Sequence, residues 1–112
     1  MSWASENVGY VAGRFGFLAK TTDGGDTWSQ VRPAQRDALY FDVMAVGENE
    51  VWACGIDRPL AVVIRSLDGG STWTSWSLPE QYTTPYRLEV TNSYVYVTGY
   101  AGRTWRFDRQ GE

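Results

Sequence analysis

The chain has 112 residues, of which 43% are hydrophobic and 21% charged, enough for one globular domain and too short for two. Without histidine and with a single cysteine, it lacks the commonest general base and metal ligand and cannot form an intrachain disulfide. A net charge of −3 argues against general nucleic-acid binding, and no apolar stretch is long enough for a membrane helix. Because 15% of the residues are aromatic and twelve are glycine, we expect an all-β domain of short strands and tight turns.

One unit of alternating strand-like segments and turns recurs three times along the chain. Apolar and polar residues alternate with the period of two that is typical of strands. A unit of four antiparallel strands in about 43 residues has the size of one propeller blade. The expected strands are, in chain order, 17–20 and 27–31 in the first copy, 42–46, 51–54, 60–65 and 72–77 in the second, and 86–90, 94–98 and 103–107 in the third.

Two sequence signals establish the repeat. An aromatic residue followed by two small or apolar residues and a glycine ends at Gly13, Gly55 and Gly99. Segments 22–28 and 67–73 are identical at five of seven positions, 45 residues apart. These spacings predict a partial β-propeller of three antiparallel blades in a single repeat domain, the third blade lacking its last strand. The expected limits are 1–112 for the domain, about 1–38 for blade 1, about 39–82 for blade 2 and about 83–112 for blade 3.

Segments 21–28 and 66–73 resemble the Asp-box, or bacterial neuraminidase repeat, with the pattern Ser/Thr-x-Asp-x-Gly-x-Thr-Trp. The longer stretch 11–25 is similar to blades of the photosystem II assembly/stability-factor family of propellers. The third copy departs from the pattern at 107–112, where Asp and Gly are one residue too far apart and no Trp follows. The resemblance implies a propeller fold and a non-catalytic interaction or assembly role, with no box formed in the third copy.

The box residues are expected to close a hairpin. Asp accepts hydrogen bonds from its own turn, Gly adopts positive φ, and Trp covers the hairpin. A calcium site at Asp23 and Asp26 is a minor alternative, because the turn offers few oxygen ligands. We therefore assign no metal, cofactor or catalytic residue. The structural assignment covers Thr22, Asp23, Gly25, Thr27 and Trp28 in the first copy and Ser66, Asp68, Gly70, Thr72 and Trp73 in the second.

Binding is expected at the end of the blades opposite the boxes. In an up-and-down sheet the connections between second and third strands, and between blades, share that end. Long loops on a rigid scaffold commonly bind partners, and Arg and Tyr are enriched at interaction hot spots. The alternative explanation for any one of these arginines is that it is an ordinary solvent-exposed residue at the rim of the blades. The candidate residues are Arg14, Arg36, Tyr40, Arg58, Tyr82, Tyr100 and Arg103.

Enzymatic activity is not expected. A sialidase, the enzyme class that carries the same box, would resemble its family at an Arg-Ile-Pro motif, which is absent. The expected function is a β-propeller module that binds a protein partner. A glycan-binding module and a structural component of a particle such as a phage virion are alternatives.

The chain provides about two and two-thirds blades, whereas propellers have four to eight. We therefore expect self-association as a dimer or trimer, or a partner, to complete the ring, with a neighbouring chain supplying the missing strand. A fragment of a longer propeller is the alternative. Residues 1–6 do not resemble a signal peptide, so a cytoplasmic location or a place within a larger assembly is expected.

Overall fold

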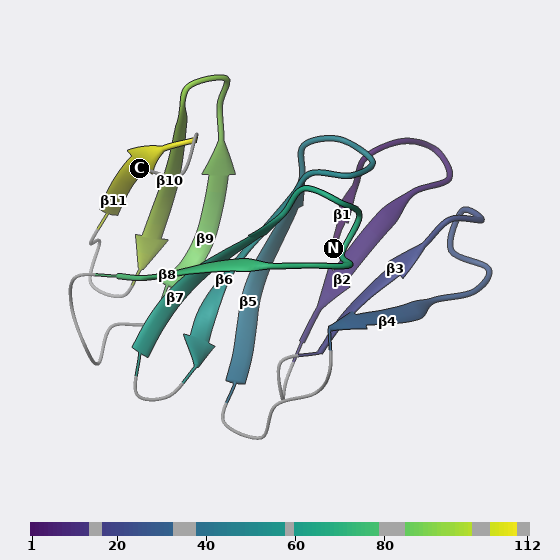
Figure 1. Ribbon diagram of the computed structural model, residues 1–112, viewed down its shortest axis with the longest axis horizontal. Coiled ribbons are helices and arrows are strands. Elements are labelled where there is room, and N and C mark those ends of the chain that lie inside the picture. The colour runs from purple at the N-terminus through teal and green to yellow at the C-terminus, as the bar shows by residue number, and fades with distance from the viewer. Residues whose placement is uncertain (14–16, 33–37, 58–59, 79–84, 100–103, 110–112) are drawn as a thin grey trace.

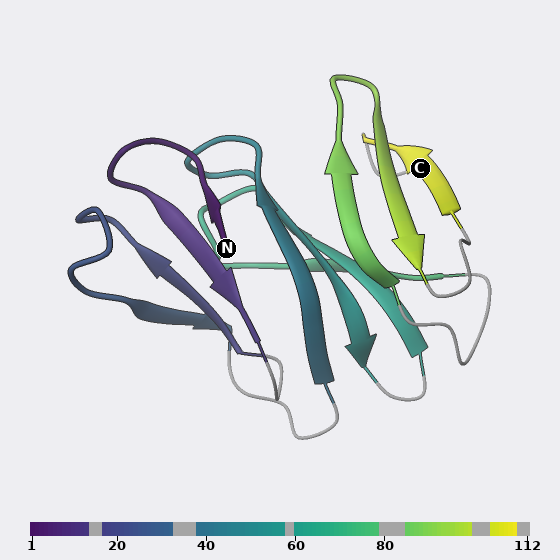
Figure 2. The same ribbon diagram turned by 180° about the vertical axis from the view of Figure 1, so that it is seen from behind.

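A computed structural model describes residues 1–13, 17–32, 38–57, 60–78, 85–99 and 104–109. The described residues form three antiparallel sheets that stand side by side (Figures 1 and 2). They contain no helix, and hence none that could cross a membrane. The expectation of an all-β partial propeller is confirmed.

Each sheet follows the chain strand by strand, so every blade is a simple meander. In the third sheet the described strands number three. The strands are β1 (Ser2–Trp3), β2 (Gly9–Ala12), β3 (Leu18–Thr21) and β4 (Ser29–Arg32) in blade 1, β5 (Ala38–Ala45), β6 (Val51–Asp57), β7 (Leu60–Ser66) and β8 (Thr74–Ser77) in blade 2, and β9 (Pro85–Val90), β10 (Tyr94–Gly99) and β11 (Thr104–Asp108) in blade 3.

Two apolar clusters lie between the blades, and β6 contributes to both. Val51 and Ala53 point toward blade 1, whereas Trp52 and Cys54 point toward blade 3. All four are at most 1% exposed. A strand covered on both faces has no polar alternation, which explains the continuous apolar run of this segment. Blade 2 is therefore the core of the described structure.

The two ends of the blades differ in their connections. One end carries the turns between first and second strands and the turns between third and fourth strands. These turns are joined by a backbone hydrogen bond from Gly24 N to Asn7 O in blade 1 and from Gly69 N to Asn49 O in blade 2, each 3.0 Å long. We call this the box end. At the opposite end, which we call the loop end, β2, β6 and β10 end and β3, β7 and β11 begin (Figure 1).

Candidate protein-binding face

The box of blade 1 is a closed hydrogen-bonded turn. The carboxylate of Asp23 accepts hydrogen bonds from the Thr27 backbone N–H at 2.9 Å and from the hydroxyls of Thr27 and Thr21. The Trp28 indole donates to Gly25 O at 3.2 Å, and Gly25 has a φ of +99° that favours glycine. Every functional group of the box is used within the turn.

The hydroxyl contacts of this box are made not by Thr22, which the structural assignment named, but by Thr21, which matches the Ser/Thr position of the box pattern. Its hydroxyl donates to Asp23 and accepts from Gly25 N at 3.0 Å, whereas Thr22 is exposed. The reason is the period of two along β3, which turns Thr21 inward and the next residue outward. Ser66 does the same in blade 2, donating to Asp68 at 2.8 Å and accepting from Gly70 N at 2.8 Å.

The pKa values of the two box aspartates are lower than that of an ordinary aspartate. The Thr27 hydroxyl, the Thr27 backbone N–H and the Thr21 hydroxyl together lower the pKa of Asp23 to about 2. Thr72 and Ser66 lower the pKa of Asp68 to about 2 in the same way. Hydrogen bonds to the charged form favour ionisation, so neither carboxyl holds a proton for general acid catalysis near neutral pH. This geometry fits a structural role.

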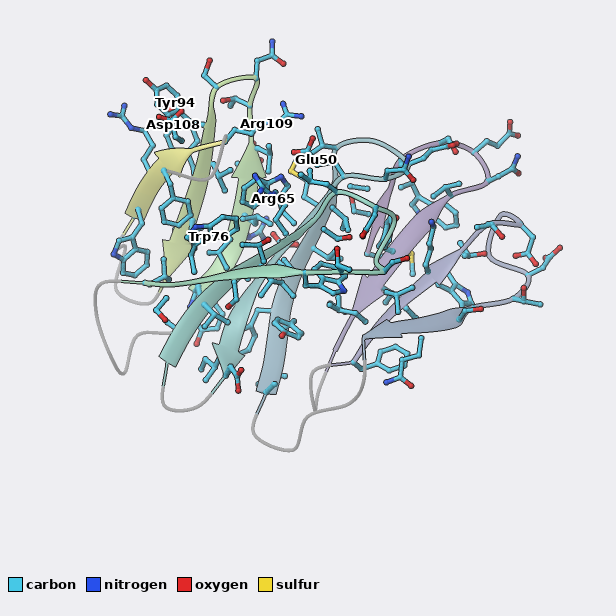
Figure 3. All side chains as sticks on the ribbon, viewed as in Figure 1. Glu50, Arg65, Trp76, Tyr94, Asp108 and Arg109 are labelled. Atoms are coloured by element: carbon cyan, nitrogen blue, oxygen red, sulfur yellow. The ribbon has the colours of Figure 1, made fainter. Side chains whose placement is uncertain are left out.

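In the third copy, an arginine lies where the first two copies have the box. The Arg109 backbone N–H donates to Ser93 O at 2.9 Å, much as the box turns do in the other blades. Its side chain instead reaches blade 2, where Nε and Nη2 donate to the Glu50 carboxylate at 3.1 and 3.0 Å. Figure 3 shows Arg109, Glu50 and Arg65 together between the two blades. The sequence predicts that segment 107–112 forms no box. Residues 110–112 of that segment lie outside the described residues.

Glu50 is the centre of this contact. Burial raises the pKa of Glu50, but hydrogen bonds from Arg109 and from the Trp52 indole outweigh it, and the net shift is downward. Beside it, the Arg65 guanidinium lies 5.4 Å from the Trp52 ring centre and 5.1 Å from that of Trp76. A paired, stacked charge cluster of this kind holds two blades together.

Of the expected binding residues, the structure describes only Tyr40. Tyr40 is 3% exposed and belongs to β5, which begins at Ala38 rather than after a loop. Its backbone N–H donates to Gly13 O at 3.2 Å, and its ring packs in the cluster between blades 1 and 2. Tyr40 is therefore a core residue, contrary to expectation. The others lie outside the described residues, namely Arg14, Arg36, Arg58, Tyr82, Tyr100 and Arg103.

Two exposed aromatic residues near the loop end were not identified from the sequence. Phe41 in β5 is 37% exposed and Tyr86 in β9 is 46% exposed. Their ring centres are 5.1 Å apart in an edge-to-face arrangement. Both lie near the starts of the first strands of adjacent blades, directly after the connections that carry Arg36 and Tyr82. Together they form an exposed aromatic pair on two adjacent blades.

A bulge turns Phe41 outward. The pairing of β5 with β6 slips between Tyr40 and Asp42, so Phe41 has no partner in the ladder. The pairing of β9 with β10 slips at the equivalent place, opposite Gly99. A Cβ on Gly55 would lie 2.1 Å from Leu39 O, which explains one of the recurrent glycines. Gly55 and Gly99, which were used only to establish the repeat, are the signal that could have indicated the two bulges.

The described residues offer few groups for metal binding or nucleophilic catalysis. No group of three or more His, Cys, Asp or Glu side chains among them is placed to hold a metal ion. Burial and the nearby Asp42 charge raise the pKa of Cys54 to about 12, so this thiol is a poor nucleophile. What the described part of the loop end offers is exposed aromatic surface.

Comparisons with known proteins agree with this architecture. The family model described as photosynthesis system II assembly factor YCF48 matches residues 1–112. A solved structure described as "YCF48 bound to D1 peptide" is similar with a TM-score of 0.80 and 24% sequence identity, over 99% of this chain. The chain spans 37% of the length of that structure. No curated protein matches the chain. The match over its whole length shows that the chain belongs to the photosynthesis system II assembly factor YCF48 family, a non-enzymatic family of BNR-type propellers.

Proposed function

We propose that the chain is a protein-binding assembly module that captures an extended peptide segment of its partner at the loop end. The observation that carries this proposal is the exposed aromatic pair of Phe41 and Tyr86, held by two bulged strands on a rigid scaffold. Aromatic anchors with few rotatable bonds are typical of binding hot spots. The description of the similar YCF48 structure, which names a bound D1 peptide, supports a peptide as the ligand class.

The arginines of the loop-end connections supply the second part of the proposed site. Arg14, Arg36, Arg58 and Arg103 are contributed by separate connections of the three blades. An arginine forms bidentate hydrogen bonds with a carboxylate, so an acidic side chain or a free carboxyl terminus suits this end. Tyr82 and Tyr100 add further aromatic surface in the same connections. The expected ligand is therefore a segment that combines apolar and acidic groups.

A titration with the D1 peptide tests the site. Isothermal titration calorimetry of the chain against this peptide is expected to show binding that Phe41→Ser with Tyr86→Ser weakens by about tenfold or more. Arg36→Ala with Tyr82→Ala is expected to weaken it as well, without a change in the unfolding temperature. Leu67→Ser is the matched control, since Leu67 is 58% exposed at the box end.

Equal affinity for the wild type and both double variants would place the site elsewhere. If the wild type does not bind the peptide but gives a signal on a glycan array, the result would favour the glycan-binding alternative instead.

We also propose that the chain associates with itself. The outward face of blade 1 exposes two large apolar side chains, Trp3 at 43% and Phe17 at 40%. Trp3 lies against Trp28 with ring centres 5.9 Å apart, which makes one aromatic surface. Exposed apolar surface of this kind commonly marks a contact site. Sedimentation velocity over a range of concentrations tests the proposal, and a monomer throughout would refute it.

A further inference from the structure

The face of blade 3 that points away from blade 2 carries tyrosines and a cation. Tyr96 in β10 is half-buried, and Arg106 in β11 is directly opposite it in the ladder. The Arg106 guanidinium lies 4.5 Å from the centre of the Tyr94 ring. Figure 3 shows Tyr94 on the side of blade 3 away from Glu50 and Arg65. We call Tyr94, Tyr96 and Arg106 the blade 3 outer cluster.

An equivalent pair joins blade 1 to blade 2. Tyr10 and Lys20 are opposite each other in β2 and β3, as Tyr96 and Arg106 are in blade 3. The Tyr10 hydroxyl donates to Glu48 O at 2.8 Å, and Lys20 Nζ donates to Gly69 O at 3.4 Å. Both acceptors are backbone carbonyls at the box end of blade 2. This contact therefore depends on the geometry of the neighbouring turns more than on their side chains.

The contact recurs between blades 2 and 3. Trp52 and Arg65 are the opposed pair in β6 and β7. Arg65 Nη1 donates to Arg109 O at 3.3 Å, again a backbone carbonyl in the turn of the next blade. In both contacts the cation of the opposed pair donates to a backbone carbonyl in a turn of the next blade, whereas the aromatic residue does so only at Tyr10, because the Trp52 indole donates to Glu50 of its own blade. The blade 3 outer cluster has the same pair on an outward face.

The outward face of blade 1 has the matching turns. Glu6 and Gly24 have the places in blade 1 that Glu48 and Gly69 have in blade 2, because the turn bond from Gly24 to Asn7 corresponds to that from Gly69 to Asn49. Phe17 has the place of Val62, which is 4% exposed in the contact with blade 1, whereas Phe17 is 40% exposed. Blade 1 therefore exposes turns and an apolar side chain at the places that blade 2 buries, with the Trp3 ring lying over Gly9, the counterpart of Val51.

We infer that blade 3 of one chain docks against blade 1 of a second copy, in the register of the contact between blades 1 and 2. In this register the Tyr96 hydroxyl donates to the Glu6 carbonyl, and Arg106 donates to the Gly24 carbonyl, of the second copy. The inference rests on the self-association proposed above and names its two surfaces. Because two different surfaces meet, the association is head to tail.

Sedimentation velocity of the full chain and its variants tests the register. Arg106→Glu is expected to weaken association by about tenfold or more, since a carboxylate then faces a carbonyl oxygen. Arg106→Lys is expected to preserve association, because Lys20 makes the equivalent contact between blades 1 and 2. Ser75→Glu is the matched control, since it adds a carboxylate to an exposed position of β8 outside both surfaces.

A mixing experiment tests the head-to-tail arrangement. Phe17→Glu alters the blade 1 surface and Arg106→Glu the blade 3 surface, and each variant alone is expected to associate about tenfold or more weakly than the wild type. An equimolar mixture is expected to form a dimer, because each chain contributes the surface that the other has lost. Tyr96→Phe, which removes a single hydroxyl, provides a second test if Arg106→Glu lowers the unfolding temperature.

The outcomes separate this inference from the proposal on which it rests. A wild type that stays monomeric overturns both. A wild type that associates, with Arg106→Glu, Tyr96→Phe and Phe17→Glu associating equally well, overturns the register and leaves self-association in place. Loss of association in the single variants with recovery in the mixture supports the inference.

Discussion

Replacement of Gly55 by alanine is expected to destabilise the chain strongly. A Cβ at this position would lie 2.1 Å from Leu39 O and 2.7 Å from the Tyr40 Cα, against ordinary contact distances of 3.4 Å or more. The backbone of β5 would have to move by about 1.3 Å, and it is held between two blades. Overpacking a core typically costs about 1–3 kcal/mol, and we expect about 3 kcal/mol here because the contacts are with backbone atoms.

Urea unfolding followed by tryptophan fluorescence measures this loss. For a domain of this size, a loss of about 3 kcal/mol lowers the unfolding temperature by about 12 °C. Gly47→Ala is the matched control, since a Cβ there meets nothing within 4 Å, and its change is expected to stay within about 0.5 kcal/mol. A Gly55→Ala variant as stable as the wild type would show that β6 does not need this close approach. The variant should also bind the D1 peptide less well, because the same bulge exposes Phe41.

Three further predictions concern the boxes, the contact between blades 2 and 3, and the thiol. The pKa of Asp68 falls from 3.8 in the unfolded chain to about 2, so the stability it contributes is complete above about pH 4 and is lost as the pH falls toward 2. Asp68→Asn should therefore lose less stability than the wild type between pH 4 and 2 in thermal unfolding, and an equal loss would contradict the hydrogen-bond assignment. A double-mutant cycle of Glu50→Gln and Arg109→Gln should give a coupling of about 1 kcal/mol in urea unfolding, and strict additivity would show that the ion pair does not stabilise the contact. Cys54 is fully buried, so iodoacetamide should label it about a hundredfold more slowly in native protein than in urea, and rapid native labelling would contradict its burial.

The propeller blades could be predicted from the sequence because their determinants are local. Asp68 and Gly70 accept and donate hydrogen bonds within one hairpin, and the Trp73 indole donates to Gly70 O in the same hairpin, so their spacing is preserved in the chain itself. The Trp73 indole also donates to Val31 O of blade 1. The strands of blade 2 follow one another in the sheet, and short antiparallel connections make neighbours in sequence neighbours in space. The pattern places Thr21 at the hydroxyl position of the first box, and the structure has it there, whereas the structural assignment named the exposed Thr22.

Register and contacts between blades depended on the tertiary structure. The alternation of apolar and polar residues predicts an ordinary strand that begins at residue 42. In the structure β5 begins earlier, and a bulge buries Tyr40 and exposes Phe41. That bulge exists because Gly55, on another strand, lets the backbone approach closely. Likewise, Arg109 pairs with Glu50 across 59 positions of the chain. By itself, the sequence determined the repeat, the turns and the blade meander, which are set by short-range hydrogen bonds and periodicity. The packing of blades against each other decided which aromatic side chains are core and which are surface.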